Sequence, residues 1–579
     1  MEIKIEKNIM IPMKDNVKLA TDVYSPKSEK ALPVLLRRLP YNKERPTYFD
    51  RPNILRLVQA GFIVVVQDVR GTGSSEGEFL PFDLEADDGE ETINWIASQS
   101  WCDGNVGMIG SSYHGMTQIL ASMRMPVALK AIAPHLTPSD FYEDLTYRGG
   151  AFELGGTLSW STRMFFTVIL KRALEQGKEM PKEFSESLQS KNTYPFHVEK
   201  LPLMETSDFN DYWPIYKEWL THPDKDDYWQ NVSFREHYHN ITVPALHSGG
   251  WFDIFLRGTI TNFQGIKQRS TNEIAKKNQR LIIGPWTHTN NTGTFAEHEY
   301  GMNAGLDGLD YTGILIEWFN KWLKGIDQQI KEEKPVKLFV MGINEWRDEE
   351  DWPLPDTVYS PYYLHSNGNA NRACGDGLLS IMSPKNEPTD VFLYNPKRPV
   401  PTIGGNLHFA NEHLSGPLDQ SAVEDRDDVL CYTSEPLLRA TEVTGPIELI
   451  LYISSSAKDT DFTGKLVDVH PDGRAEILTE GILRVRYRQS FDSPELMVPG
   501  NVYKIKIGMA ATSNVFKEGH RIRLEVSSSN FPKYDRNSNT GGEIYNESEG
   551  SFITAVNSVH HNESYPSHLL LPIIDRDHK

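Results

Sequence analysis

Hydrophobic positions follow two different periods along the chain. Up to about residue 140, and again from about residue 243, short continuous apolar runs alternate with stretches of helical spacing. Apolar runs bounded by turn residues are typical of strands buried on both faces, and their alternation with helices favours a largely parallel sheet covered on both sides. The runs lie at 33–36, 62–66, 106–109, 131–133, 243–248 and 281–283, and helices are expected at 85–98 and 313–324.

Beyond about residue 355 the period changes to two. Segments of mostly alternating polarity lie at 447–453, 482–487, 502–507 and 521–526, and turns such as 471–473 separate several of them. Regularly spaced short strands predict an all-β sandwich or jelly roll. Between the two regions, residues 141–240 are aromatic and helical in pattern, as in the run 165–170, without clear strands.

These patterns predict three parts in the chain of 579 residues. An α/β domain is formed by residues 1–140 and 241–354, and residues 141–240 are a helical cap inserted into it. Residues 355–579 are expected to form a β-sandwich of the jelly-roll type. The length supports this division, since a domain averages ~150 residues.

The charge balance restricts the range of partners. Lys and Arg number 59 and Asp and Glu number 79, which gives a net charge of −20, and no basic stripe is evident. Nucleic acid and anionic membranes attract basic surfaces, so neither is expected as a partner. The three cysteines, Cys102, Cys374 and Cys431, are too widely spread for a disulfide framework. Without a signal-peptide pattern or a run approaching ~18 apolar residues, we expect a cytoplasmic protein outside the membrane.

The segment Gly110-Ser-Ser-Tyr-His-Gly115 contains the main candidate for chemistry. It lies between a predicted strand and a helical pattern, which is the setting of a nucleophile elbow that projects one hydroxyl over a helix N-terminus. Ser112 occupies the nucleophile position. The usual G-x-S-x-G pattern would place glycine at 114, where this chain has His114, with Gly115 one step later. A glycine–serine turn also occurs as a simple connector, so the motif alone leaves both interpretations open.

Two further strand ends carry residues that complete a catalytic set. Asp253 follows the run 243–248 after Gly-Gly-Trp-Phe, and His288 follows the run 281–283 after Gly-Pro-Trp-Thr. The order Ser, Asp, His is that of α/β hydrolases. In such a set His288 accepts the proton of the Ser112 hydroxyl, while Asp253 fixes the imidazole tautomer and stabilises the imidazolium. Three strand ends in this order favour catalysis over a structural role.

These residues resemble the CocE/NonD hydrolases, a family that includes amino-acid ester hydrolases and X-Pro dipeptidyl-peptidases. The elbow has the G-x-S-Y-x-G form of that family, so its departure from the commoner pattern supports the resemblance. The C-terminal segments are similar to the C-terminal domain of the X-Pro peptidases. The similar segments extend over essentially the whole chain and are 40–41, 67–77, 250–253, 284–288, 459–462, 465–469 and 519–524.

The resemblance implies a serine hydrolase with an α/β-hydrolase core, a helical cap and a C-terminal jelly roll. It makes Ser112 the nucleophile, His288 the base and Asp253 the orienting acid. It also implies an oxyanion hole made of the Tyr113 backbone N–H and the Tyr41 hydroxyl, and a phenol fixed beside the developing alkoxide is a reasonable donor. A homodimer that packs through the β-rich part is consistent with the resemblance.

Other motifs do not support a cofactor or a metal. The glycines at 71, 73 and 77 depart from the dinucleotide spacing, and Glu76 lies where a pyrophosphate would bind. The histidines at 408 and 413, with Glu412, lack the spacing of a zinc-hydrolase motif. The histidine pair at 560 and 561 has no further ligands in suitable spacing. Catalysis without metal or cofactor is therefore expected.

The residues around the triad acid bear on the substrate. Asp253 is followed by Ile254 and Phe255, and a cation stands at Arg257, so this segment offers nothing to an α-amino group. Four aromatic residues are candidates for an apolar acyl or aryl pocket, although they fit an ordinary core equally well. They are Phe152, Trp160, Phe252 and Phe255.

Three acids in the insertion are the candidates for an ammonium site. Glu143, Asp144 and Glu153 could hold the N-terminus of a peptide, or they could lie on solvated helix faces. A dipeptidyl-peptidase needs such an ammonium site, whereas an esterase does not.

We therefore predict a serine hydrolase that cleaves carboxylic esters with a bulky or aromatic acyl group through an acyl-Ser112 intermediate. Its substrate is expected to be a small ester or a short peptide. Two alternatives stay open. One is X-Pro dipeptidyl-peptidase or other amide hydrolysis by the same triad. The other is a binding protein whose jelly roll recognises carbohydrate or a partner while the hydrolase core is inactive.

Overall fold

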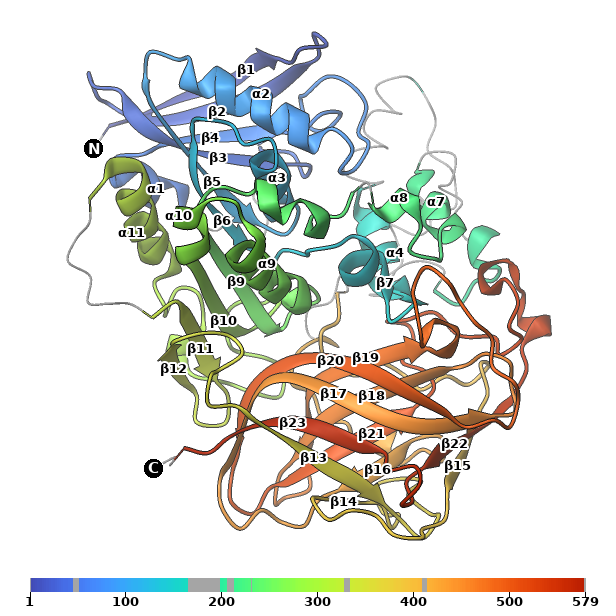
Figure 1. Cartoon of the computed structure of the whole chain (residues 1–579). Coiled ribbons are helices and arrows are strands. Elements are labelled where there is room, and N and C mark those ends of the chain that lie inside the picture. Colours follow the sequence, from blue (N-terminus) through green and yellow to red (C-terminus); the bar gives the residue numbers. More distant parts are fainter. Residues whose placement is uncertain are drawn as a thin grey trace.

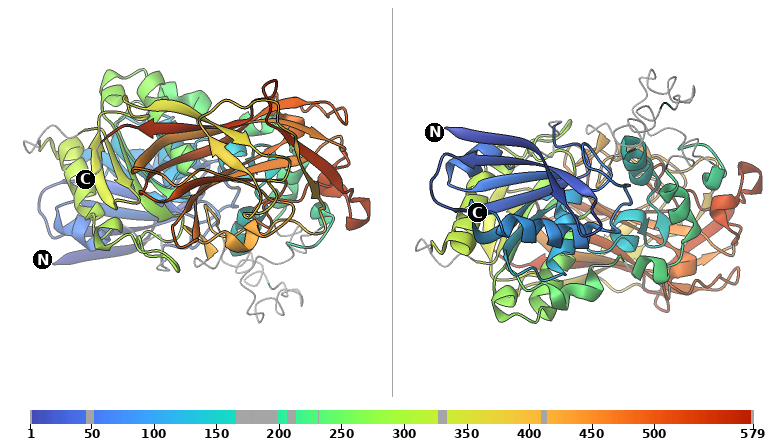
Figure 2. Two further views of the ribbon diagram at one scale, coloured as in Figure 1. Left: turned by 90° about the horizontal axis from the view of Figure 1, so that it is seen from below. Right: turned by 90° about the horizontal axis from the view of Figure 1, so that it is seen from above.

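Two large sheets and a helical segment beside them make up the structure (Figure 1). The computed structural model describes residues 2–44, 52–164, 177, 198–205, 213–230, 232–326, 334–408 and 414–576. Both chain ends lie on the side of the molecule away from helices α4 (Leu154–Met164) and α7 (Ile215–Thr221) (Figure 2).

The N-terminal sheet has ten strands in the order β1-β2-β4-β3-β5-β6-β9-β10-β11-β12. All neighbouring pairs from β4 through β11 are parallel. The outer pairs β1/β2, β2/β4 and β11/β12 are antiparallel. The strands are β1 (Ile3–Pro12), β2 (Lys18–Pro26), β3 (Leu32–Leu39), β4 (Ile63–Asp68), β5 (Cys102–Ser111), β6 (Leu129–His135), β9 (Ala245–Phe252), β10 (Gln279–Thr287), β11 (Val336–Val340) and β12 (Glu345–Glu349).

The central strands are longer at their carboxyl ends than the apolar runs predict. Strand β9 continues past Ser248 through both glycines to Phe252, and β10 continues past Ile283 to Thr287. The two strands are paired here, and a Cβ on Gly250 would overlap the carbonyl of Trp286. Glycine therefore allows the two strands to stay together to their ends. Asp253 and His288 follow directly, at the same edge of the sheet.

Helices contact the sheet in two groups. Helices α2 (Glu85–Ala97) and α3 (Tyr113–Ser122) pack on each other and on β3 and β5, and α9 (Leu256–Arg269) packs on β9 and β10. Helices α1 (Ile54–Gln59) and α11 (Tyr311–Lys324) contact each other, and α11 also contacts β5 and β6. The short helix α10 (Glu273–Lys277) follows α9. The acidic first turn of α2, with Glu85, Asp87 and Asp88, suits the positive end of the helix dipole.

The chain between β6 and β9 is mostly helical where the structure describes it. Besides α4 and α7 it contains α8 (Asp227–Gln230) and a short hairpin of β7 (Tyr147–Arg148) and β8 (Ala151–Phe152). The sequence pattern did not reveal this hairpin, because two-residue strands are too short to show a period. The expected helical run 165–170 lies outside the described residues.

The C-terminal part is mostly β, in a second sheet of eleven strands. Paired strands are antiparallel except β14 and β16, and β17 pairs with β20, β22 and β23. The strands are β13 (Val358–His365), β14 (Leu378–Ser380), β15 (Asp390–Tyr394), β16 (Leu430–Thr433), β17 (Thr441–Ser455), β18 (Asp461–Val469), β19 (Ala475–Arg484), β20 (Tyr503–Phe516), β21 (Arg521–Ser527), β22 (Ala555–His560) and β23 (His568–Ile574), with the short helix α12 (Ser421–Glu424).

The parts share apolar and polar contacts. One hydrophobic core contains Trp251 and Phe252 of β9 together with side chains of the C-terminal strands, such as Leu449 and Phe516. The helical segment is also bonded to the C-terminal part, because the Asp535 N–H donates to the Phe152 carbonyl. Among the described residues, no helix is long and apolar enough to cross a membrane.

Candidate active site

Ser112 lies at a sharp junction between β5 and α3. Its backbone has φ 59° and ψ −122°, which is an unusual conformation for a residue with a side chain, and such strain is common at functional sites. The Ser112 N–H donates to the His135 carbonyl at 2.8 Å, which ties the turn to the end of β6. The Ser112 carbonyl accepts hydrogen bonds from Gly115 and Met116 and thereby begins the helix. The local fold is therefore that of a nucleophile elbow.

The histidine in place of the usual elbow glycine has a structural reason. The His114 ring is fully buried, and its Nδ1 accepts a hydrogen bond of 3.2 Å from Arg37 Nε. Burial, and then the nearby Arg37 charge, lower the pKa of His114 well below its ordinary value, so the ring is neutral. The position where the elbow approaches a neighbouring segment too closely for a side chain is Gly115, one residue later, beside Thr137. A Cβ on Gly115 would overlap Thr137 Oγ1 and lie 3.1 Å from Thr137 Cβ.

Replacing Gly115 by alanine is expected to destabilise the fold by about 1–3 kcal/mol, because overpacking against Thr137 forces α3 or the loop after β6 to move. The urea midpoint of unfolding, followed by tryptophan fluorescence, measures the loss. Gly508→Ala is the matched control, since no heavy atom lies within 4 Å of the Cβ position there. Equal stability of the two variants would contradict the steric explanation for Gly115.

The three residues that follow or end the central strands lie within hydrogen-bond distance of one another. His288 Nε2 is 2.9 Å from Ser112 Oγ, and His288 Nδ1 is 2.7 Å from Asp253 Oδ1. All three are buried, with exposed fractions of 6% for Ser112, 3% for His288 and 0% for Asp253. The Asp253 carboxylate can accept a hydrogen bond but cannot donate one, so His288 Nδ1 carries the imidazole hydrogen. His288 Nε2 is then the acceptor for the Ser112 hydrogen. This geometry suits base-assisted attack by the Ser112 oxygen.

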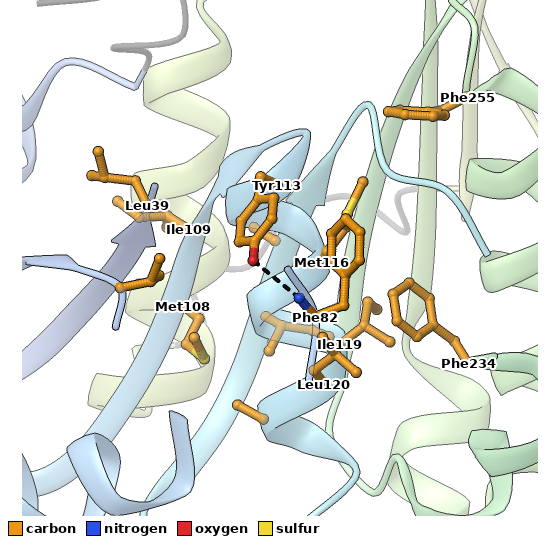
Figure 3. Close-up of a cluster of buried hydrophobic side chains, with 14 of the residues drawn as sticks. Leu39, Phe82, Met108, Ile109, Tyr113, Met116, Ile119, Leu120, Phe234 and Phe255 are labelled. Carbon is orange, nitrogen blue, oxygen red and sulfur yellow. Dashed lines mark hydrogen bonds between the residues drawn. The ribbon is translucent and has the colours of Figure 1, made fainter. Parts of the chain in front are cut away.

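Tyr113 turns its side chain away from the Ser112 hydroxyl and into the core. Its hydroxyl donates to Glu85 at 2.8 Å. The same oxygen accepts from the Phe82 N–H at 3.3 Å (Figure 3). Burial, together with the Glu85 charge, raises the pKa of Tyr113 well above its ordinary value. Because Tyr113 is the first residue of α3, its backbone N–H has no partner within the helix and is available to an oxyanion.

Tyr41 lies beside Ser112. Its ring is buried, and its oxygen accepts a hydrogen bond of 3.2 Å from Trp160 Nε1. Burial raises the pKa of Tyr41, whereas Arg163, Trp160 and a hydrogen bond with Ser112 lower it. A phenol held beside the serine oxygen can donate to negative charge that develops there.

A cavity opens over Ser112 and His288. Its apolar lining includes Trp160 and Phe255, and the Phe255 ring packs edge-on against His288 with 5.0 Å between the centroids. The remaining lining residues are Tyr41, Phe82, Tyr113, Met116, Asp144, Leu145, Arg148, Glu153, Gly156, Thr157, Arg163, Trp219, Ile254 and His408.

Two of the four aromatic candidates lie outside this cavity, which corrects their proposed place. Phe152 is buried among tyrosines, with ring centroids 5.4 Å from Tyr147 and 5.9 Å from Tyr545. Phe252 is buried in the core shared with the C-terminal sheet and contacts Phe295. Both side chains belong to hydrophobic core, the interpretation that the sequence had left open.

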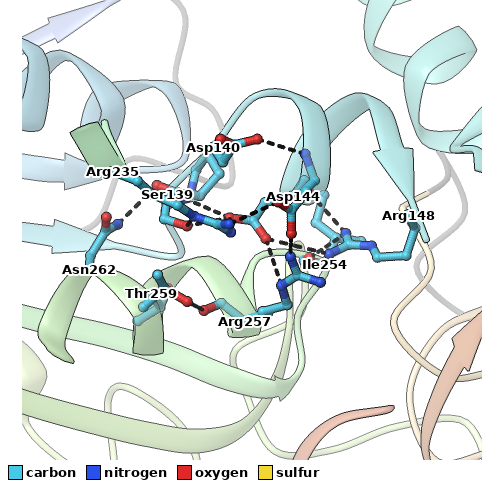
Figure 4. Close-up of polar contacts among 12 residues, drawn as sticks. Ser139, Asp140, Asp144, Arg148, Arg235, Ile254, Arg257, Thr259 and Asn262 are labelled. Carbon is cyan, nitrogen blue, oxygen red and sulfur yellow. Dashed lines mark hydrogen bonds and ion pairs between the residues drawn. The ribbon is translucent and has the colours of Figure 1, made fainter. Parts of the chain in front are cut away.

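The acids of the insertion do not lie on solvated helix faces, so that interpretation was wrong. Asp144 is buried among the guanidinium groups of Arg148, Arg235 and Arg257 (Figure 4). Glu143 is paired with Arg235 at 3.1 Å and also with Arg257. The Arg257 charge is therefore used to hold the insertion onto the start of α9.

Glu153 differs from the other two acids. It is buried in the cavity wall, and neither carboxylate oxygen makes a hydrogen bond to the described residues. Arg148 Nε is 4.0 Å away. Burial raises the pKa of Glu153, although Lys533 and Arg148 oppose the change. This acid is the one placed to meet a polar group of a substrate.

His408 is a cavity residue that sequence reasoning missed, since it was considered only as a metal ligand. Its ring lies 4.9 Å from that of His288, edge to face. Burial, then the neighbouring His288 and Arg163, lower the pKa of His408 well below its ordinary value. Its motif partners Glu412 and His413 lie outside the described residues. No local signal could have found this contact, because it joins the C-terminal half of the chain to the triad.

The histidine pair at 560 and 561 lies in hydrogen-bonded networks. His561 Nε2 is 2.8 Å from Asp390, and His560 Nε2 is 2.9 Å from Ser454 Oγ. A further group, Asp468, His470 and His520, brings three ligand atoms within 4.8 Å of one another. There His520 Nδ1 is already bonded to Asp468 at 2.8 Å, and the Arg474 guanidinium is 3.3 Å from His470. A cation beside His470 makes an ion-pair network a better description than a metal centre.

Comparison with known proteins identifies the family of the chain. Residues 15–290 match the family model "X-Pro dipeptidyl-peptidase (S15 family)", and residues 328–570 match "X-Pro dipeptidyl-peptidase C-terminal non-catalytic domain". Cocaine esterase of Rhodococcus sp. (strain MB1 Bresler) is 43% identical over 99% of both chains.

Solved structures give the same result for the fold. An aminopeptidase from Thaumarchaeota archaeon superposes with a TM-score of 0.84 at 26% identity, over 99% of this chain and 97% of the other. An α-amino acid ester hydrolase superposes with a TM-score of 0.83 at 25% identity, over 99% and 96%. With a cocaine esterase this similar along almost its whole length, the chain belongs to the CocE/NonD family of serine hydrolases.

Proposed function

We propose that this protein hydrolyses carboxylic esters with a bulky or aromatic acyl group through an acyl-Ser112 intermediate. The observation that carries the proposal is the hydrogen-bonded chain from Ser112 through His288 to Asp253, at the base of a cavity lined by aromatic side chains. The likeness to cocaine esterase supports ester hydrolysis. Since the relatives are enzymes, the alternative of a non-catalytic binding protein has no support.

The ten-stranded sheet is the core of an α/β hydrolase in this proposal, and the helical segment between β6 and β9 is its cap. The parallel strand order and the elbow after β5 support the first assignment. The C-terminal part is a jelly roll, which the predominance of antiparallel strands supports. The boundaries at residues 140, 240 and 354 fall in connections between elements.

The mechanism uses each group where it lies. His288 takes the proton of the Ser112 hydroxyl as the oxygen attacks the ester carbonyl, and buried Asp253 stabilises the imidazolium. The Tyr113 N–H and the Tyr41 hydroxyl donate to the oxyanion of the tetrahedral intermediate. His288 then protonates the departing alcohol. In the second half-reaction His288 activates water, which attacks the acyl-Ser112 carbonyl and releases the acid.

Amide or X-Pro dipeptide hydrolysis by the same triad is the second candidate. One observation favours it: Glu153 lies in the cavity wall without a hydrogen bond to the described residues, and its carboxylate could accept a substrate ammonium. The name of the matching family model also points to this activity. Against it, Asp144 is already paired with arginines, and Ile254 and Phe255 beside the triad acid are apolar.

Relative turnover of two substrates distinguishes the candidates. We expect kcat/KM for a phenyl or benzoyl ester to exceed that for Ala-Pro-anilide by several orders of magnitude, with Ser112→Ala as the blank. Efficient cleavage of the anilide would contradict the ester assignment. In that case Glu153→Gln should reduce kcat/KM for the anilide more than for the ester, because only the peptide has an ammonium. Equal losses on both substrates would exclude Glu153 as the ammonium site.

A further inference from the structure

The phenol of Tyr41 is contacted by two residues of the cap helix α4. Trp160 Nε1 donates a hydrogen bond of 3.2 Å to the phenol oxygen. The Arg163 guanidinium lies over the Tyr41 ring, with Cζ 4.9 Å from the centroid. Residues three apart share one face of a helix, so α4 presents both groups to Tyr41 together.

We propose that Trp160 is a positioning residue for ester hydrolysis, whose indole N–H occupies the acceptor side of the Tyr41 oxygen and directs the phenolic hydrogen toward the oxyanion. The inference rests on the proposed function, in which Tyr41 is an oxyanion donor. It changes the role of Trp160 from an apolar wall of the cavity to a part of the oxyanion hole.

The direction of one hydrogen decides whether a phenol can act in an oxyanion hole. A phenol has a single hydrogen to donate, and an indole N–H is a donor without an acceptor. The hydrogen of Tyr41 therefore cannot point at Trp160 and is directed to another acceptor. The Ser112 oxygen beside the phenol can accept this hydrogen in the free enzyme, because the Ser112 hydrogen is directed to His288 Nε2. Once Ser112 has attacked, the oxyanion takes that place.

Two further neighbours of the phenol, Arg163 and His114, do not accept this hydrogen. The Arg163 guanidinium contains donors alone. The His114 ring, with its centroid 5.7 Å from that of Tyr41, accepts the Arg37 Nε–H on Nδ1. A neutral imidazole that accepts on Nδ1 carries its hydrogen on Nε2, so it too presents a donor. Trp160, Arg163 and His114 therefore offer no acceptor to the phenolic hydrogen.

The same contacts strengthen the phenol as a donor. A hydrogen bond received by the oxygen polarises the O–H bond, and a cation over the ring face favours negative charge on the phenol. Burial raises the pKa of Tyr41, and Arg163 and Trp160 oppose that rise. The benefit is greatest when negative charge has developed on the oxyanion, so it lowers the barrier more than it strengthens substrate binding.

The indole of Trp160 is held in one orientation by other aromatic rings. It stacks on Trp219 at 5.9 Å with an interplanar angle of 19°, and lies nearly parallel to Phe82 at 6.2 Å and 16°. Trp213 packs edge-on against it at 5.6 Å. This packing fixes the direction of the N–H toward Tyr41, as a positioning group requires.

Trp160→Phe tests the role of the N–H, because phenylalanine keeps an aromatic wall and loses the donor. We expect kcat/KM for an aryl ester to fall about 5- to 30-fold, mainly through kcat. The inhibition constant of an alkylboronic acid, which forms a tetrahedral adduct with Ser112, should rise by a similar factor. Trp318→Phe, in helix α11, is the matched control. It removes a buried indole whose Nε1 makes no hydrogen bond to the described residues, and it should leave both quantities near wild type.

A double-mutant cycle separates the two proposals. Tyr41→Phe is expected to lower kcat/KM by about 10²- to 10³-fold, and Trp160→Phe should cost nothing further in that background. The inference is overturned if Trp160→Phe loses no more activity than Trp318→Phe. It is also overturned if Trp160→Phe causes an equally large loss in the Tyr41→Phe background, where the phenol is absent. Full activity of Tyr41→Phe alone would overturn the oxyanion role of Tyr41, and with it that part of the proposed function.

Discussion

Replacing Ser112 by alanine is expected to lower kcat/KM for an aryl ester by about 10⁵- to 10⁶-fold, which is the size of loss typical for removal of a serine nucleophile. Without the Ser112 hydroxyl, His288 and Asp253 have no nucleophilic attack to assist, so the rate acceleration that they provide is lost as well. The remaining rate reflects binding and the oxyanion donors. Steady-state hydrolysis of a phenyl or benzoyl ester measures the change, and a fluorophosphonate probe locates the labelled serine by mass spectrometry.

The neighbouring serine provides the matched control. Ser111 is the last residue of β5 and is buried like Ser112, so Ser111→Ala makes the same chemical change one position away. We expect Ser111→Ala to keep most of the activity and the fluorophosphonate label. Equal losses of kcat/KM in Ser111→Ala and Ser112→Ala would mean that both substitutions act by disturbing the elbow, and not by removing the Ser112 hydroxyl. Retention of activity in Ser112→Ala would contradict the assignment outright.

Replacing Asp253 by asparagine is expected to lower kcat/KM by about 10⁴-fold. Asp253 Oδ1 accepts from His288 Nδ1 at 2.7 Å, and this bond leaves Nε2 as the acceptor for Ser112. The asparagine amide can donate to Nδ1 instead, which moves the imidazole hydrogen to Nε2 and blocks proton transfer from Ser112. The variant should bind substrate and still fail in the chemical step, so kcat falls more than KM changes.

A second buried His–Asp pair serves as the control for Asp253→Asn. In the C-terminal sheet, His561 Nε2 is 2.8 Å from Asp390, and both side chains are fully buried. Although burial raises the pKa of Asp390, hydrogen bonds from His561, Ala370 and Ser366 hold it below its ordinary value. Because the folded-state pKa is depressed, Asp390 stabilises the fold at neutral pH, and this contribution is lost as the pH falls through that pKa.

The two asparagine variants should therefore behave in opposite ways. Asp390→Asn is expected to lower the urea midpoint at pH 7 and to leave kcat/KM near wild type, and its stability deficit should shrink toward acid pH. Asp253→Asn should lose activity with a smaller change in the midpoint. A parallel fall in stability and activity for Asp253→Asn would point to misfolding and contradict the tautomer argument.

The positions of the triad residues follow from local patterns in the sequence. Ser112, Asp253 and His288 each stand at or just after a short apolar run, and parallel strands bring such positions to one edge of a sheet. The strands β5, β6, β9 and β10 lie side by side, and the three side chains are within hydrogen-bond distance. Tyr41, by contrast, has no local signal of function, and only the family resemblance pointed to it.

The wall of the cavity could not be predicted in the same way. Strand β9 is buried on both faces, so its apolar pattern does not tell which side chain faces the active site. Phe252 turns into the core shared with the C-terminal sheet, whereas Phe255, three residues later, lines the cavity. The charges of Glu143 and Asp144 are likewise met by Arg235 and Arg257, which lie about a hundred residues away in sequence.

The sequence by itself determined the alternation of strands and helices around the site, the mostly β nature of the C-terminal part, and the three residues that follow strands, because each depends on a short-range pattern of burial. Only the tertiary structure decided which aromatic rings surround the substrate, that Glu153 is buried without a hydrogen bond to the described residues, and that Trp160 donates to Tyr41. Those features depend on how segments that are distant in sequence pack together. Their packing depends on the shapes and hydrogen-bonding groups of both segments, and neither segment alone encodes it.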